Sequence, residues 1–191
     1  MQNYIATCLQ EGTELRTSTL NNKEQLTTIN NIGELFYATI ISGGKILFCG
    51  NGGSAADAQH IAAELVGRFE TERKALPAIA LTTDTSILTA VSNDYGYERV
   101  FARQVAALAT EKDVVVGITT SGNSKNIEFA LKEAREIGAK TVGLLGGSGG
   151  TCKELCNYAI VIGSNKAARV QEMHITIGHI ICGLVDKKFT K

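Results

Sequence analysis

The sequence has no excess of charge, because its 191 residues include 19 lysines and arginines and 19 aspartates and glutamates, interspersed along the chain. A protein that binds a nucleic-acid backbone or an anionic membrane surface normally presents a basic patch. The balanced composition argues against both. We therefore expect neither nucleic acid nor membrane as a partner.

Long apolar runs are also missing. No stretch approaches the roughly 20 apolar residues of a membrane-spanning helix, and residues 1–12 contain no basic segment followed by an apolar core, as a secretory signal would. The five cysteines are odd in number and include no C-x-x-C pair. We expect reduced, mostly buried thiols, with Cys152 and Cys156 as packing residues and not metal ligands. These absences predict a soluble, cytoplasmic protein.

Proline occurs once, at Pro77, directly before a predicted strand, where its missing N–H does least harm. A chain of this length with 44% hydrophobic residues is expected to form one α/β domain over residues 1–191. From residue 45 onward short apolar runs alternate with longer amphipathic ones, which predicts a parallel sheet covered on both faces. The predicted strands are 45–50, 78–82, 113–119, 140–145 and 158–162, and the predicted helices are 54–68, one from about 84, 98–109, 124–137, 150–156 and 166–188. The fold class is therefore α/β, a five-stranded parallel sheet sandwiched by helices in a doubly wound, flavodoxin-like arrangement.

Residues 3–41 show no strand pattern and contain two apolar helical repeats separated by Asn21 and Asn22. They predict an N-terminal helical hairpin over residues 1–41, ahead of a core over residues 42–191. The last helix carries apolar residues at alternating three- and four-residue steps from Val170 to Leu184. Such a seam packs on another helix, and together with the hairpin it offers more apolar surface than one sheet covers. A homo-oligomer assembled through helices is expected.

One stretch, residues 45–69, combines a buried strand, a glycine turn and a helix that opens near Ser54. Backbone N–H groups at such a helix start point toward an anion, so phosphate is the first ligand to consider. Gly50, Gly52 and Ala55 also satisfy the loose dinucleotide pattern G-x-G-x-x-A. The acidic residue expected about 20 positions later is poorly placed, and the lysine of a nucleotide P-loop is missing. A nicotinamide cofactor stays a weaker alternative.

A second polar loop, TTSGNS at residues 119–124, follows the third predicted strand. Hydroxyls beside a helix N-terminus bind a phosphate monoester without a lysine. Taken alone, its serines and asparagine would more often be turn and cap residues. Two such loops at the carboxyl ends of parallel strands favour a ligand. Asn93 and Asp94 end another predicted helix, and they would bind sugar hydroxyls if that turn lies at the same edge.

The three histidines lie in predicted helices, His60 near the first glycine turn and His174 and His179 in the last helix. A single helix histidine is more often a packing or surface residue than a ligand. Glu64 follows His60 by four residues, so both side chains lie on one face of their helix. If the last helix packs beside that face, His60, Glu64 and His179 form a plausible ligand set for zinc. His174 is offset on its helix and is interpreted as structural.

Four segments together resemble the sugar isomerase (SIS) domain family and, within it, the phosphoheptose isomerases: CGNGGSAADAQHIAAEL, the Asn93-Asp94 turn, TTSGNS and RVQEMHITIGHI. The resemblance covers essentially the whole chain, whereas TTSGNS alone indicates only an SIS fold. It implies an aldose–ketose isomerase that converts D-sedoheptulose 7-phosphate to D-glycero-D-manno-heptose 7-phosphate through an enediol. This is the first step of heptose biosynthesis for lipopolysaccharide or capsule. The resemblance also implies a homotetramer with pockets at subunit interfaces.

The resemblance further implies roles for individual residues. Glu64 would be the catalytic base and His179 the acid. One zinc ion per subunit would be bound by His60, Glu64, Gln171 and His179, and Glu64 and Gln171 would also face the substrate. The sugar phosphate would be held by Ser54, Thr119, Ser121 and Ser124, with Asn51, Gly52, Gly53, Asn93, Asp94 and Thr120 lining the pocket. A carboxylate bound to zinc is a weaker base, so either Glu64 leaves the metal during turnover or another group takes the proton.

Two other hypotheses fit the same fold. A non-catalytic group of SIS proteins binds the replication initiator, and the segment FETERKALPAIAL resembles that group. A module that senses a sugar phosphate without turning it over is the other alternative. A binding module has no reason to keep four residues of the implied zinc site together, so their presence favours the isomerase.

Overall fold

The computed structural model describes residues 1–190, which form one sheet of five parallel strands in the order β2-β1-β3-β4-β5. The strands are β1 (Ile46–Gly50), β2 (Ala78–Ala80), β3 (Val114–Thr119), β4 (Lys140–Gly146) and β5 (Tyr158–Ile162). Every neighbouring pair is parallel. The predicted α/β class with a five-stranded parallel sheet is confirmed.

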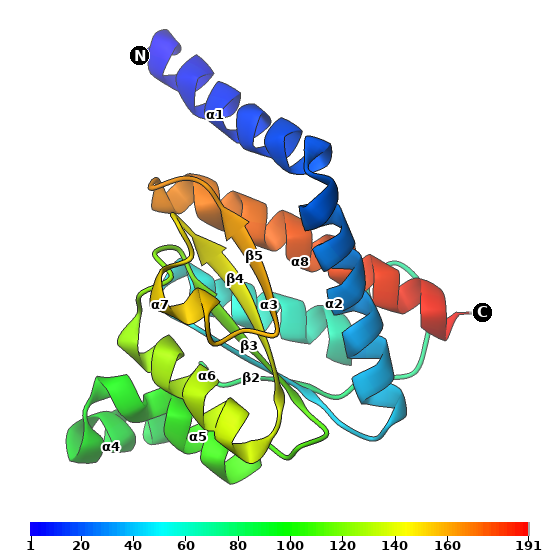
Figure 1. The fold of residues 1–191 in the computed structure, drawn as a ribbon, viewed down its shortest axis with the longest axis vertical. Coiled ribbons are helices and arrows are strands. Elements are labelled where there is room, and N and C mark those ends of the chain that lie inside the picture. The colour runs from blue at the N-terminus through cyan, green and yellow to red at the C-terminus, as the bar shows by residue number, and fades with distance from the viewer. Residues whose placement is uncertain (191) are drawn as a thin grey trace.

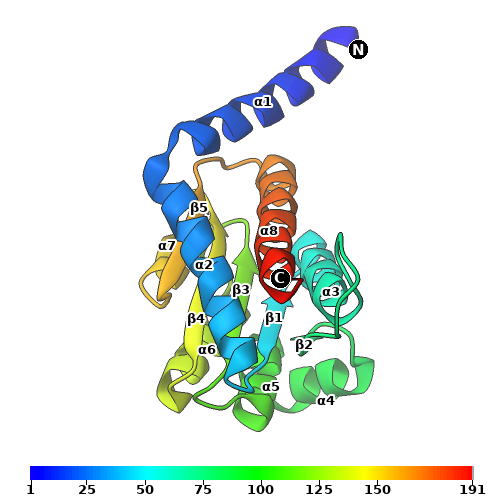
Figure 2. The same ribbon diagram turned by 90° about the vertical axis from the view of Figure 1, so that its right-hand side faces the viewer.

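Helices cover both faces of this sheet (Figures 1 and 2). They are α1 (Gln2–Asn21), α2 (Lys23–Ile41), α3 (Gly53–Val66), α4 (Thr85–Tyr95), α5 (Val100–Leu108), α6 (Lys125–Ile137), α7 (Gly150–Lys153) and α8 (Ala167–Phe189), with a 3₁₀ turn, η1 (Tyr97–Arg99), between α4 and α5. The predicted helix over 98–109 is thus divided between η1 and α5. The second strand and the helix predicted over 150–156 are both shorter than predicted, ending at Ala80 and Lys153.

The strands are continuous apolar runs because both of their faces are buried. In β1, Ile46 and Phe48 face a core shared with α2, α3 and α8. Leu47 and Cys49 point the opposite way, into a second core built with α5 and α6, as the two-residue alternation of a strand requires. Two apolar layers therefore hold the sheet rigidly, including the loops that leave the carboxyl ends of its strands.

The two predicted N-terminal helices are present and meet at Asn22, whose side chain accepts a hydrogen bond from the Gln25 N–H at 3.0 Å. They do not fold back on each other. α2 packs on the sheet through Ile32 and Phe36, which are almost fully buried, whereas α1 projects away from the body in both views (Figures 1 and 2). Gly12 is the single buried residue of α1. The pair is therefore open. Leu15 still packs against the core, whereas Tyr4, Ile5 and Leu9 near the start of α1 are exposed.

The chain crosses from one side of β1 to the other. It leaves β1 for β2 at the edge and then enters β3 on the opposite side of β1. The carboxyl ends of β1 and β3 consequently flank the point where the strand order reverses, which is where open α/β sheets bind ligands.

Within residues 1–190, no helix combines the length and apolarity that spanning a membrane requires.

Candidate active site

Three hydroxyls gather between the end of β3 and the start of α6. Thr119 Oγ1 lies 2.9 Å from Ser124 Oγ and 3.3 Å from Ser121 Oγ. Ser124 occupies the N-cap position of α6, yet its side chain makes no capping hydrogen bond. Its hydroxyl points to Thr119 instead, so the Ser124 side chain leaves the first N–H groups of α6 uncapped. An oxyanion placed there would meet both hydroxyls and the helix N-terminus. We call this group the hydroxyl cup.

The start of α3, at the end of the adjacent strand β1, is similarly open. Gly52 has φ 56° and precedes the helix without a side-chain cap, a conformation that favours glycine. Ser54, in the first turn, is buried. A Cβ added to Gly53 would lie 2.5 Å from Nε2 of Gln171. The side chain of Gln171 therefore crosses directly over the first residue of α3.

α3 and α8 run side by side with the same polarity. Gln171 meets the start of α3, and His179, about two turns later, meets His60. His60 Nε2 lies 3.1 Å from His179 Nε2 and 3.1 Å from Glu64 Oε1. The three ligand atoms all lie within 4.8 Å of one another. The structure thus brings together the three residues that the sequence analysis selected from two distant helices.

These three side chains fit a zinc ion. Two imidazole nitrogens and one carboxylate oxygen match the catalytic zinc sites that use two histidines and a glutamate. Ligand atoms at about 2.0–2.1 Å from a tetrahedral ion are separated by about 3.3 Å, close to the 3.1 Å separations seen here. Neighbouring rings hold the geometry, since the Phe69 ring stacks on His179 with centroids 5.6 Å apart. Zinc ligation itself stays a prediction, including the part assigned to Gln171.

Asp57, which the sequence analysis missed, belongs to the same face of α3. It precedes His60 by three residues, so the two side chains are neighbours on the helix. Its Oδ2 is buried and has no hydrogen-bond partner. Burial raises the pKa of this carboxyl to about 6, against the opposing effect of His60. A carboxyl that titrates near neutrality beside such a cluster is a candidate proton carrier. The three-residue spacing to His60 was a signal that could have identified it.

Asn126 is a second residue that the sequence analysis missed. It is buried in the first turn of α6, and its amide exchanges two hydrogen bonds with Asn51. Asn51 Nδ2 donates to Asn126 Oδ1 at 2.9 Å, and Asn126 Nδ2 donates to Asn51 Oδ1 at 2.8 Å. The Tyr97 hydroxyl donates to the same Asn51 oxygen at 3.0 Å. These contacts tie the loop after β1 to the start of α6 and fix the orientation of Asn51.

Asn93 and Asp94 make no hydrogen bond to the hydroxyl cup in the described residues 1–190. Both are exposed in the last turn of α4, and Asn93 Nδ2 donates to Asp94 Oδ1 at 2.8 Å. Within residues 1–190 no hydrogen bond joins this pair to the loops after β1 and β3. Thr120 is half-buried beside the cup. Contacts from these three residues to a sugar stay predictions.

His174 lies away from the cluster, in the core. Its ring is fully buried, and Nε2 lies 3.1 Å from the carbonyl oxygen of Leu145, so Nε2 carries the proton and donates. Burial lowers the pKa of His174 to about 4, despite the opposing effect of the Leu145 carbonyl. The imidazole is therefore neutral at pH 7, in agreement with its interpretation as a structural residue.

Comparisons with known proteins show which family has this sequence and fold. A model of the SIS domain matches residues 12–146. The phosphoheptose isomerase of a Nitratiruptor species is 63% identical over 145 residues, which cover 76% of this chain and 78% of that protein. The phosphoheptose isomerase of Clostridium acetobutylicum is 48% identical over 188 residues, covering 98% and 96%. The solved phosphoheptose isomerase of Neisseria gonorrhoeae has a TM-score of 0.89 at 40% identity, covering 97% of this chain and 98% of that one. The chain therefore belongs to the SIS domain family and, within it, to the phosphoheptose isomerase family.

Proposed function

We propose that this chain is an aldose–ketose isomerase that converts D-sedoheptulose 7-phosphate to D-glycero-D-manno-heptose 7-phosphate. The observation that carries the proposal is the convergence of His60, Glu64 and His179 next to an open, uncapped helix start. The start of α3, which can bind an anion, and His60, which belongs to the cluster, are about two helical turns apart. The phosphate would occupy the hydroxyl cup and the neighbouring start of α3, and C1 and C2 of the sugar would lie at the cluster.

The reaction moves a proton from C1 to C2 of the open-chain ketose. A base takes the proton from C1 while the C2 carbonyl oxygen gains one, which gives the enediol. A proton is then added to C2 and the O1 proton is lost, leaving the C1 aldehyde. Glu64 would act as the base and His179 as the acid. Asp57 offers a second carboxyl on the same face if Glu64 stays on the metal.

His60, Glu64, Gln171 and His179 would hold one zinc ion per subunit. When bound, zinc would supply Lewis-acid polarisation of the sugar oxygens as charge develops on the enediolate. Hydroxyl groups of the cup, with Ser54, would hold the phosphate and so restrict the sugar to one orientation. Asn51, whose amide is fixed by Asn126, would donate its second Nδ2–H to the sugar.

The exposed apolar residues support assembly into an oligomer, for which we propose a tetramer. On α1, Tyr4, Ile5 and Leu9 are 74%, 59% and 68% exposed, although a monomer rarely leaves such a stripe uncovered. Copies of the same chain would cover it through helix packing. We further propose that the enzyme acts in the cytoplasm and supplies heptose for lipopolysaccharide or capsule.

A metal analysis of the purified protein, paired with an isomerase assay on sedoheptulose 7-phosphate, tests the proposal. We expect about one zinc per chain, turnover that a chelator abolishes, and recovery when zinc is added back. A protein without metal and without turnover would favour the binding or sensing module. Those alternatives are not favoured at present, because the relatives compared above are named isomerases.

A further inference from the structure

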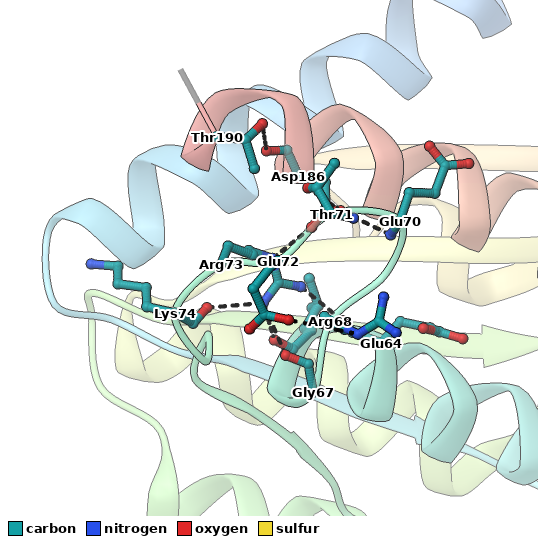
Figure 3. Close-up of polar contacts among 11 residues, drawn as sticks. Glu64, Gly67, Arg68, Glu70, Thr71, Glu72, Arg73, Lys74, Asp186 and Thr190 are labelled. Atoms are coloured by element: carbon teal, nitrogen blue, oxygen red, sulfur yellow. Dashed lines mark hydrogen bonds and ion pairs between the residues drawn. The ribbon is translucent and has the colours of Figure 1, made fainter.

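The segment that joins α3 to β2, residues 67–77, contacts both helices that carry the zinc-ligand candidates (Figure 3). It begins immediately after the turn of α3 that contains Glu64. Phe69, near its start, stacks on His179 of α8. The polar contacts of Figure 3 extend this connection from the last turn of α3 to the last turns of α8. The segment therefore bridges the two halves of the cluster.

Arg73 caps the carboxyl end of α3. Its Nη2 donates to the carbonyl oxygen of Glu64 at 2.8 Å, and its Nη1 donates to that of Leu65 at 2.9 Å. The same Nη1 also lies 3.0 Å from the carbonyl oxygen of Lys74. Carbonyls in the last turn of a helix have no partner inside the helix, and a cation there complements the dipole. The guanidinium thus holds the backbone of Glu64 itself.

Asp186 ties the same guanidinium to α8. Its Oδ1 accepts from Arg73 Nε at 2.5 Å, and the two side chains are 1% and 3% exposed. Its Oδ2 accepts the N–H groups of Glu70 and Thr71, each at 3.0 Å, and the Thr71 hydroxyl at 2.9 Å. Burial acts to raise the pKa of Asp186, but the donors from Thr71 and Arg73 outweigh it and lower that pKa. The pair is therefore an ionised, hydrogen-bonded ion pair in the interior.

The position of Asp186 on α8 connects the pair to the cluster. It follows His179 by about two helical turns, so both side chains lie on the face of α8 that meets α3. A continuous set of contacts runs from the Glu64 carbonyl through Arg73 to Asp186, and along the rigid α8 backbone to His179. A shift of α3 along α8 would break several of these hydrogen bonds at once.

We propose that Arg73 and Asp186 are positioning residues that set the separation of Glu64 and His179 and thereby the zinc affinity of the site. This inference rests on the proposed function, because it assumes that the cluster binds zinc. Neither residue touches the metal or the sugar. Outer residues that orient metal ligands typically contribute 10- to 100-fold to metal affinity, which is the size of effect expected here.

The chain provides a matched control for a merely structural role. Asp113, before β3, is equally buried and also accepts four hydrogen bonds, two from Lys45 and two from Thr110. This second ion pair joins the amino ends of β1 and β3, at the opposite edge of the sheet from the cluster. Asp113→Asn should therefore lower stability about as much as Asp186→Asn without affecting the site.

The experiment measures zinc binding to the metal-free full-length protein by competition with a chromogenic zinc chelator. Wild type, Arg73→Lys, Asp186→Asn, Thr71→Val and Asp113→Asn are compared at a temperature where all are folded. Lysine keeps the charge but lacks the planar guanidinium, whose three separate nitrogens reach the two carbonyls and the carboxylate. Thr71→Val is the mildest change, since it removes only one donor to Asp186 and retains both charges, so this variant stays informative if the others do not fold.

We expect Arg73→Lys and Asp186→Asn to bind zinc at least tenfold more weakly, Thr71→Val about threefold more weakly, and Asp113→Asn as wild type. Excess zinc should restore most of kcat, with KM for sedoheptulose 7-phosphate unchanged. Equal zinc affinity in all variants, or an equal loss in Asp113→Asn, overturns the inference alone. A wild-type protein that binds no zinc overturns the proposed metal site and this inference with it.

Discussion

Gly53→Ala is the most informative single substitution in the site, because it perturbs Gln171 without changing that residue. The added Cβ would lie 2.5 Å from Nε2, 2.7 Å from Cδ and 2.8 Å from Oε1 of Gln171. These atoms are the far end of a flexible side chain, so Gln171 would swing away and the backbone would stay in place. Gly53 does not have a positive φ, so alanine fits the local backbone.

The substitution should change the free energy of unfolding only slightly. Alanine gains up to about 1 kcal/mol over glycine in a helix, and less at the first position. Moving Gln171 into a poorer rotamer costs about 0.5–1.5 kcal/mol. The two effects nearly cancel, which predicts a melting temperature within about 4 °C of wild type for a chain of this size. Function should change far more, with zinc affinity and kcat/KM lowered at least tenfold.

Thermal unfolding, zinc competition and steady-state kinetics check this prediction, with Gly163→Ala as the control. A Cβ added to Gly163 would have no neighbouring atom within 4 Å, so alanine there should alter nothing. The decisive comparison adds Gln171→Ala. If Gly53→Ala acts through Gln171, it should have little further effect in that background. A further tenfold loss there, or wild-type activity of Gly53→Ala alone, would refute the reasoning.

Three other predictions follow from the site and the core. Glu64→Gln and His179→Gln should each lower kcat by about 10²-fold or more, the usual contribution of a general acid or base, and near-normal turnover in both would remove them from the mechanism. Ser124→Ala should raise KM for the phosphorylated sugar by about tenfold, from a lost hydrogen bond to a charged group, while an unchanged KM would place the phosphate elsewhere. The pKa of His174 is about 4 in the folded protein, below its ordinary 6.5. Between pH 6.5 and pH 4 the unfolded chain therefore binds more protons than the folded one, and the free energy of unfolding falls as the pH drops through this range. The free-energy advantage of wild type over His174→Gln, measured by urea unfolding, should therefore shrink by about 3 kcal/mol from pH 7 to pH 4, and a pH-independent difference would contradict the buried neutral imidazole.

Spacing within one helix could be interpreted correctly from the sequence because the helix alone determines it. His60 and Glu64 were paired on that basis, and Asp57 carried the same kind of signal. The approach of His179 to His60 joins residues 119 positions apart. It depends on α8 packing beside α3, which no local pattern determines. Asn126 gave no local signal, since its role depends on an amide pair with Asn51 across two loops.

The N-terminal helices show the same limit. Their apolar repeats predicted two helices, and the structure contains both. The angle between them depends on what each helix packs against. α2 packs on the sheet, whereas α1 projects from the body (Figure 2). The two helices therefore do not form the compact hairpin that was predicted.

Hydrophobic periodicity and turn residues act over a few positions, so they were enough to predict the order of the strands and helices, the parallel sheet and the two loops at its carboxyl edge. They did not reveal the division of residues 98–109 between η1 and α5. Which distant side chains meet is known only from the folded chain: His179 with His60, Gln171 over Gly53, and Arg73 with Asp186. Those meetings depend on how α8 packs along α3, which is set by the summed burial of many apolar side chains and not by any local pattern. The chemistry of the site lies in these long-range contacts.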